Sequence, residues 1–410
     1  MTAVRVIFVE PSFPNNQRQF VRALADTGAT VIGIGESPQE SLDEELKTWM
    51  AHYHQVGSVV DVGAMADVVR WIQGKAWVDR IETTIEAHTL PVAQVREQCT
   101  IPGTSVRTAW LCRDKPSMKD ALREAGVPTA ASAAVQTADE VWTFAKTVGY
   151  PIILKPRTGA GALDTTRVDN DSELEAALAM FGGQGVASIA VEEFVEGHEG
   201  FYDTMAVGGH APLDFVSHYY PNVLEAMRTR WISPQFVSTN RVDTVTEYAE
   251  LRELGHRVAE TLGIGTSATH MEWFFGPKGL KFSEIGCRPP GVGAWDLYSA
   301  GNDLDLYREW ANAIVHGDVS ARPSRRFASG IIALRPDRDG QIAGYSGVDQ
   351  VQAKYGEWVL DAHLPHPGTP TQPPEAGYMA NAYVRMRHPD YDVLRGMLDD
   401  VGRTVQVHAT

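Results

Sequence analysis

Cysteine is scarce in this sequence, and the few cysteines show no metal-binding or disulfide spacing. The 410 residues contain Cys99, Cys112 and Cys287, and none belongs to a CxxC pair. Disulfide scaffolds and cysteine-rich zinc sites need more thiols at closer spacing. We therefore expect a reducing cytoplasm as the location, and we interpret Cys287 as a packing residue.

Positive charge is also in short supply. Lys and Arg number 36 against 52 Asp and Glu, which gives a formal net charge of −16, and no segment concentrates basic residues. Nucleic-acid and anionic membrane surfaces need local cationic density. The sequence therefore predicts neither partner, and any bound phosphate must be met by a few placed side chains.

Long hydrophobic runs and several common catalytic motifs are missing too. The N-terminal apolar run is cut short by Glu10 and Pro11, too early for a signal peptide or a membrane-spanning core, so we expect no export and no membrane insertion. No GxxxxGK[ST], HExxH or GxSxG occurs. Their absence excludes the usual P-loop, zincin and hydrolase-elbow interpretations.

Strand-like and helical patterns alternate along the chain and predict several domains. A chain of this length exceeds what one hydrophobic core usually supports. We expect an α/β and α+β multidomain protein with an N-terminal parallel α/β domain over residues 1–113. A central domain over 114–320 is expected to consist of two lobes, 114–200 and 201–320, and a small α+β domain is expected over 321–410.

A strand that ends in Lys155 runs directly into a loop of small residues. This loop, residues 156–162, contains Thr158, Gly159 and Gly161. Such residues let backbone N–H groups approach an anion closely, and the lysine adds a positive charge for the same phosphates. An ordinary β-turn with a surface lysine is the alternative.

Further along, an apolar strand carries two adjacent carboxylates, Glu192 and Glu193, and then turns at Gly197. Its extended backbone could pair with an adenine edge while Phe194 or Val195 packs on the ring. Glu199 could accept hydrogen bonds from ribose hydroxyls. The alternative is an exposed acidic edge strand.

The sharpest feature is a predicted hairpin formed by residues 269–275 and 280–285, with Gly-Pro-Lys-Gly between them. Antiparallel pairing could aim Glu272 and Glu284 at one face. Two neighbouring carboxylates repel each other unless a cation lies between them, and Mg²⁺ suits such oxygen ligands. The alternative, two solvated glutamates on a polar face, is weakened by the apolar residues around them. Arg288 follows directly and could meet a carboxylate or a phosphate.

Together with Asp114 and Lys115, these ordered segments resemble the ATP-grasp superfamily over roughly residues 1–335. The resemblance implies an ATP-grasp fold with a preceding α/β domain, as in carboxylate-amine ligases and biotin carboxylases. It implies that ATP and Mg²⁺ are bound, with Lys155 and Arg288 taking part in catalysis. It assigns the α- and β-phosphates to Lys115 and Lys155, the adenine to Glu192, Phe194 and Val195, the ribose to Glu199, and the metal to Glu272 and Glu284. Thr158, Gly159, Gly161 and Glu193 belong to the same expected nucleotide site.

The resemblance implies an ADP-forming ligase that activates a small-molecule carboxylate as an acyl phosphate and passes it to an amine. A biotin-carboxylase-like phosphorylation of bicarbonate and a nucleotide-binding protein without turnover are the alternatives. A homodimer is left open.

One position departs from the superfamily pattern. Where many members have a metal-binding asparagine two residues after the second glutamate, this chain has Gly286. Glycine has no side chain to bind a metal, so either water completes the shell or one magnesium site is weaker.

Overall fold

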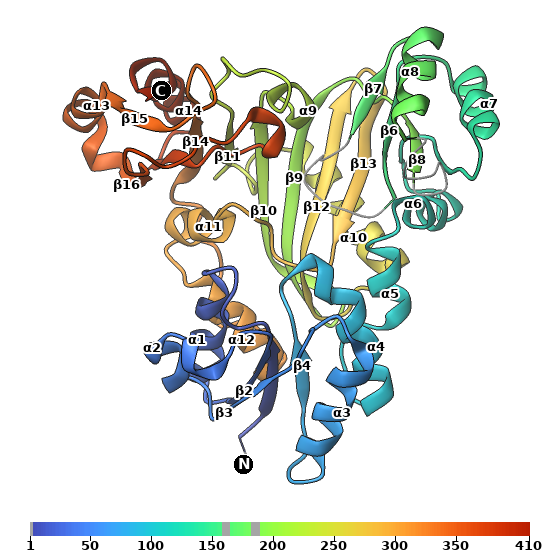
Figure 1. The fold of residues 1–410 in the computed structure, drawn as a ribbon, viewed down its shortest axis with the longest axis vertical. Helices are drawn as coiled ribbons and strands as arrows, with labels where there is room; N and C mark the ends of the chain where they lie inside the picture. The colour runs from blue at the N-terminus through green and yellow to red at the C-terminus, as the bar shows by residue number, and fades with distance from the viewer. Residues whose placement is uncertain (1–2, 158–164, 182–188) are drawn as a thin grey trace.

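The computed structural model describes residues 3–157, 165–181 and 189–410. The chain forms three lobes, with the N-terminal domain below two upper lobes in the view of Figure 1. Thr158, Gly159 and Gly161 lie outside the described residues.

The N-terminal domain is built on a parallel sheet in the order β3-β2-β1-β4. Fully buried apolar side chains fill β1, as expected for a strand covered on both faces. This confirms the predicted parallel α/β domain. Its strands are β1 (Arg5–Val9), β2 (Thr30–Gly35), β3 (His52–Gln55) and β4 (Arg80–Glu82), and its helices are α1 (Gln17–Asp26), α2 (Glu44–Thr48), α3 (Val62–Gln73), α4 (Thr89–Cys99) and α5 (Val106–Leu111).

The second lobe is a small antiparallel sheet in the order β5-β8-β6-β7 with helices beside it. Its first helix, α6 (Lys115–Glu124), begins where the Asp114 carboxylate accepts a hydrogen bond of 3.3 Å from Ser117 N. The other elements are β5 (Ser132–Ala134), β6 (Ile152–Pro156), β7 (Thr166–Val168), β8 (Ile189–Glu193), α7 (Ala138–Val148) and α8 (Asp171–Phe181).

A long sheet in the order β13-β12-β9-β10-β11-β14-β17-β16 extends from the side of the second lobe to the C-terminal strands of the other upper lobe. The predicted hairpin is confirmed as β12 (Ser267–Gly276) and β13 (Gly279–Gly286), with Gly279 at a φ of +76° in the turn. The remaining strands are β9 (His198–Val207), β10 (His210–Tyr220), β11 (Gln235–Ser238), β14 (Ala328–Leu334), β16 (Val359–His363) and β17 (Ala382–His388).

The C-terminal strands extend this same sheet, because β14 pairs with both β11 and β17. The domain boundary at residue 320 therefore stays a prediction, since the sheet is continuous across it. The C-terminal part also contains α13 (Val348–Tyr355), α14 (Tyr391–Thr404) and a separate ladder of β15 (Ile342–Ser346) with β18 (Gln406–Ala409).

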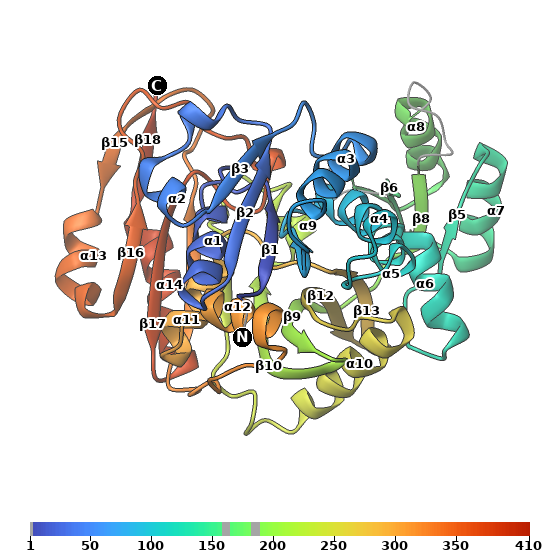
Figure 2. The same ribbon diagram turned by 90° about the horizontal axis from the view of Figure 1, so that it is seen from below.

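The N-terminal domain shares its core with the long sheet. Helix α12 (Leu306–His316) lies beside α1, as Figures 1 and 2 show, and Trp310 meets Phe20 edge-on with ring centroids 5.1 Å apart. Helix α11 (Ala294–Asn302) adds Trp295 to the same cluster. In a second buried apolar cluster, Cys287 lies 3.0 Å from Cys112 (Sγ to Sγ), which agrees with its interpretation as a packing residue.

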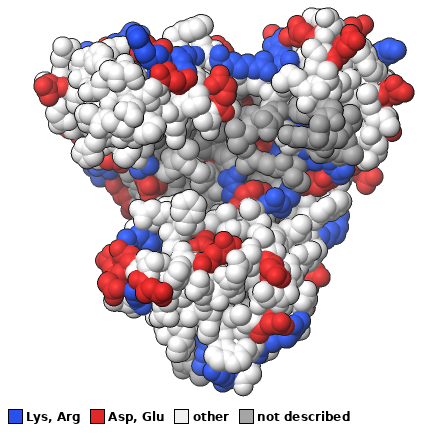
Figure 3. Space-filling view, viewed as in Figure 1, with Lys and Arg blue, Asp and Glu red and all other residues white. Residues whose placement is uncertain are grey.

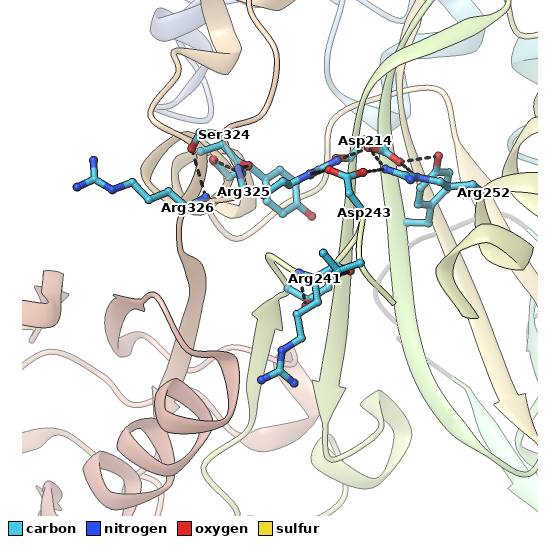
Figure 4. Close-up of polar contacts among 12 residues, drawn as sticks. Asp214, Arg241, Asp243, Arg252, Ser324, Arg325 and Arg326 are labelled. Carbon is cyan, nitrogen blue, oxygen red and sulfur yellow. Dashed lines mark hydrogen bonds and ion pairs between the residues drawn. The ribbon is translucent and has the colours of Figure 1, made fainter. Parts of the chain in front are cut away.

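A cluster of ion pairs ties α10 (Glu247–Leu262) to the segment before β14 (Figure 4). The Asp214 carboxylate on β10 accepts a hydrogen bond of 2.6 Å from Arg252 Nε and another from Arg325. Asp243 pairs with the same two arginines. These groups satisfy one another and do not line the cleft, so we assign them a structural role.

Within the described ranges, no helix has the length and apolar character needed to cross a membrane.

Candidate active site

A cleft of about 1230 Å³ lies where the three lobes meet. Figure 3 shows this face hollowed between the N-terminal domain and the upper lobes. The N-terminal domain contributes the segments after β1 and β4, including Gln17 and Glu86. These strands are neighbours at the point where the strand order reverses, which is where open α/β sheets bind ligands.

The acidic hairpin forms one wall of the cleft. Glu272 and Glu284 lie directly opposite each other in the register of β12 and β13, and both line the cleft. The register shifts immediately after Glu272, so a bulge lies beside the pair. The predicted juxtaposition of the two carboxylates is thus present, and their role as metal ligands stays a prediction.

Lysines face Glu284 from the neighbouring lobe. Its Oε2 atom is 3.4 Å from Lys115 Nζ and 3.9 Å from Lys155 Nζ. Burial alone would raise the pKa of Glu284, but the attraction of these lysines outweighs it and lowers the pKa to about 2. Glu284 is therefore ionised at neutral pH, as a metal ligand must be.

Glu192 lines the cleft, and its contact with adenine stays a prediction. Its buried Oε2 atom is 2.6 Å from Lys119 Nζ and 2.9 Å from Lys155 Nζ. The carboxylate is therefore engaged by two lysines. Lys119 was missed by sequence reasoning, although it lies one turn after Lys115 on α6 and so on the same helix face.

Phe194 and Val195, the residues that follow β8, line the cleft as expected. Arg167 of β7 stacks over the Phe194 ring, with its guanidinium carbon 4.3 Å from the centroid, and Glu193 pairs with Lys278 of the hairpin turn. A β-carbon at Gly276 would lie 2.1 Å from the backbone oxygen of Glu196. The glycine therefore lets the hairpin turn approach the segment that follows β8.

Glu199 is a buried residue of the cleft wall. Its Oε2 atom accepts a hydrogen bond of 2.7 Å from Val223 N, at the start of the short helix α9 (Val223–Ala226). Burial, followed by the nearby negative charge of Glu272, raises the pKa of Glu199 to about 8. The side chain is therefore largely protonated at neutral pH before any ligand binds.

Arg288 faces the cleft and is held by the N-terminal domain. Its Nε atom donates a hydrogen bond of 2.7 Å to Glu86 Oε2. Arg113 also donates to the backbone oxygen of Glu86. A β-carbon at Gly286 would lie 3.0 Å from the same Oε2 atom. Sequence reasoning missed Glu86, because nothing in the local pattern after β4 marks it.

A buried chain of polar groups runs from α11 through β9 to His270 of β12, which lines the cleft. Tyr298 OH donates a hydrogen bond of 2.5 Å to Asp203, and Asp203 is 2.7 Å from His270 Nδ1. Burial by itself would lower the pKa of His270, but the Asp203 carboxylate outweighs it and raises the pKa to about 9. His270 Nε2 lies 3.8 Å from Glu272 Oε1, so an imidazolium faces the proposed metal carboxylate.

The donor atoms suit magnesium. Among the described residues, no group of three or more His, Cys, Asp or Glu side chains is arranged around one point. Two facing carboxylates nevertheless fit Mg²⁺, which keeps water and takes nucleotide phosphate oxygens as its other ligands. Glu272 and Glu284 would hold the ion.

Comparison with known proteins identifies a matching family and relatives of this chain. Residues 114–200 match the family described as "Carbamoyl-phosphate synthase L chain, ATP binding domain". The L-arginine-specific L-amino acid ligase of Bacillus subtilis is 26% identical over 324 residues, 77% of this chain and 76% of the relative.

Solved structures share the whole fold. The L-amino acid ligase from Bacillus licheniformis matches with a TM-score of 0.77 at 16% identity and covers 100% of both chains. The biotin carboxylase domain of the Hydrogenobacter thermophilus 2-oxoglutarate carboxylase, solved as a dimer with MgADP and bicarbonate, matches with a TM-score of 0.67 at 16% identity. That match covers 99% of this chain and 91% of that one. At these identities the structural matches bear on the fold alone.

The chain is therefore an ATP-grasp protein with an N-terminal α/β domain. Within that superfamily it is an ATP-dependent, ADP-forming carboxylate-amine ligase. The relatives do not favour the biotin-carboxylase-like alternative or a protein without turnover.

Proposed function

We propose that this ligase joins amino acids: one supplies the carboxylate that is activated, and a second supplies the amine. The observation that carries the proposal is the pair of opposite charges, Arg288 and Glu86, on the cleft wall beside Glu272 and Glu284. A zwitterion presents both charges in a small volume, and Arg288 can bind its carboxylate. The amino acid ligase similarity over most of the chain supports the same substrate class.

The remaining site residues take their proposed roles around ATP. Lys115 and Lys155 bind phosphate oxygens, Phe194 and Val195 pack on the adenine, and Glu199 accepts from the ribose. Thr158, Gly159 and Gly161, which lie outside the described residues, are proposed to contact the phosphates. When bound between Glu272 and Glu284, Mg²⁺ would neutralise and orient the phosphate oxygens.

In the proposed reaction, an oxygen of the substrate carboxylate attacks the γ-phosphorus of ATP, and ADP leaves. The Lys155 ammonium and the Arg288 guanidinium stabilise the negative charge that develops during this transfer. The amine then attacks the acyl carbon, an amide bond forms, inorganic phosphate leaves, and the amine proton passes to solvent. No covalent enzyme intermediate is needed, because positioning and electrostatics supply the catalysis.

The test is phosphate release from ATP with defined substrate pairs and mass spectrometry of the products. Amino acid pairs should give ADP, phosphate and a dipeptide. Amino acid amides, which lack the carboxylate, should give no phosphate by themselves. Phosphate release with bicarbonate in place of both amino acids would contradict the proposal and favour carboxylase chemistry. ATP binding without turnover across the twenty amino acids would favour a nucleotide-binding protein.

We further propose that the protein works in the cytoplasm as a homodimer. The buried thiols of Cys99, Cys112 and Cys287, none of which forms a disulfide, suit a reducing compartment. Light scattering during size-exclusion chromatography tests the dimer, since a single peak at the mass of one 44.9 kDa chain would contradict it.

A further inference from the structure

Lys119 is a buried lysine that lines the cleft and that the mechanism above does not use. Its relative exposure is 1%, and its Nζ atom lies 2.6 Å from Glu192 Oε2. A buried ammonium is retained only where a partner offsets its desolvation. Glu192 is that partner.

The same carboxylate oxygen also meets Lys155, at 2.9 Å. The other oxygen, Glu192 Oε1, is buried and has no hydrogen-bond partner among the described residues. The two lysines therefore orient the Glu192 carboxylate, and they share its negative charge. Of the two contacts, the one from Lys119 is the shorter.

This sharing matters because Lys155 must also bind phosphate. A buried carboxylate next to a single lysine pairs with it strongly, since the low dielectric magnifies their attraction. Such a pairing would compete with phosphate oxygens for the lysine. With Lys119 in place, part of the Glu192 charge is already neutralised.

The ionisation of Lys119 and Glu192 agrees with this arrangement. Burial lowers the pKa of Lys119 to about 8, which still leaves an ammonium at neutral pH. For Glu192, burial alone would raise the pKa, but attraction by Lys119 and Lys155 outweighs it and lowers the pKa. The carboxylate therefore stays ionised between the two lysines.

We propose that Lys119 is a positioning residue of the nucleotide site: by pairing with Glu192 it fixes that carboxylate and weakens its hold on the Lys155 ammonium, which then binds nucleotide phosphates. The inference rests on the proposed roles of Lys155 and the cleft in ATP binding. Absence of ATP binding by the wild-type protein in the assay below would contradict the proposed function. The role of Lys119 is contradicted only by the affinities of the variants.

The experiment is calorimetric titration of Lys119→Met with ATP, ADP and adenosine. We expect the Kd for ATP and ADP to rise about tenfold and the Kd for adenosine to stay within about twofold of wild type. The contrast between ligands with and without phosphates is the readout that a loss of packing would not produce. Equal weakening for all three ligands, or an unchanged Kd for ATP in folded protein, would overturn the proposal.

Two further variants complete the design. Lys146→Met, at an exposed position on α7 of the same lobe, is the matched control and should bind all three ligands like wild type. Lys119→Met combined with Glu192→Gln removes both charges, so no buried carboxylate is left to compete for Lys155. This double variant should regain at least about threefold of the ATP affinity lost in Lys119→Met.

The double variant also keeps the proposal testable if Lys119→Met does not fold. Without the Glu192 carboxylate, Lys119 has nothing through which to act on Lys155. The double variant and Glu192→Gln alone should then bind ATP with Kd values within about twofold of each other. A larger difference would show that Lys119 acts on the nucleotide by another route and would overturn the proposal.

Discussion

The Glu86 carboxylate of the N-terminal domain lies against Gly286 at the end of the acidic hairpin, so that a β-carbon there would be 3.0 Å from Oε2. Many members of the superfamily have a metal-binding asparagine at the position of Gly286. In this chain the space beside that position is filled by an acidic side chain that binds Arg288. Gly286 thus accommodates the contact between two domains.

The first prediction concerns this glycine. Gly286→Asn should displace Glu86 from Arg288 and raise the KM for the carboxylate substrate about tenfold, with the Kd for ATP little changed. Gly286→Ala, which requires only a small shift of a flexible carboxylate, is the control and should lie near wild type. A variant with wild-type KM and tighter Mg²⁺ dependence would instead show that asparagine enters the metal shell.

The second prediction concerns the metal carboxylates. Glu272→Gln and Glu284→Gln should each lower turnover about 100-fold, because each removes a charged ligand that Mg²⁺ needs. Thermal unfolding should change far less than turnover in both variants. Titration of Mg²⁺ against ATP turnover is the measurement, and Glu225→Gln, at an exposed position on the cleft rim, is the matched control. Full activity of Glu284→Gln, or of wild type in a chelator, would remove the metal assignment.

The third prediction concerns Arg288. Arg288→Lys keeps the charge but loses the planar fork, so kcat/KM for the carboxylate substrate should fall about 100-fold while the Kd for ATP stays within about threefold. Arg228→Lys changes an exposed arginine that also lines the cleft and should have little effect. Steady-state kinetics with the carboxylate varied at saturating ATP would decide it. A fall in ATP affinity without a change in kcat would contradict the assignment.

The fourth prediction is a pH dependence of stability. The folded pKa of His270, about 9, lies above its ordinary value of 6.5. The stabilisation by Asp203 is therefore fully present below pH 6.5 and is lost as the pH rises through 9. Between these values the free energy of unfolding of wild type should fall, by on the order of a few kcal/mol from this pair.

The check is urea unfolding between pH 6 and 9.5 for wild type and for the double variant Asp203→Asn with His270→Gln. The difference in pH slope isolates this pair from other titrating groups. His256→Gln, at an exposed position on α10, is the control and should keep the wild-type slope. Identical slopes for wild type and the double variant would show that Asp203 does not stabilise the protonated form of His270.

The amino-acid order by itself determined the nucleotide-binding framework. Local patterns were sufficient for the two strands of the hairpin and its Gly-Pro-Lys-Gly turn. The bulge after Glu272, which those patterns do not show, is what places Glu272 opposite Glu284. The N-terminal parallel sheet followed from the same kind of short-range periodicity.

Only the tertiary structure decided which partners the charged groups have. Glu86 and Arg288 are 202 positions apart in the chain, and their contact depends on how the N-terminal domain docks through α11 and α12. The pairing of Lys119 with Glu192 likewise joins a helix to a strand of another part of the sequence. Spacing rules describe neighbours within one helix or hairpin, whereas these contacts arise from packing between elements, which no local pattern encodes.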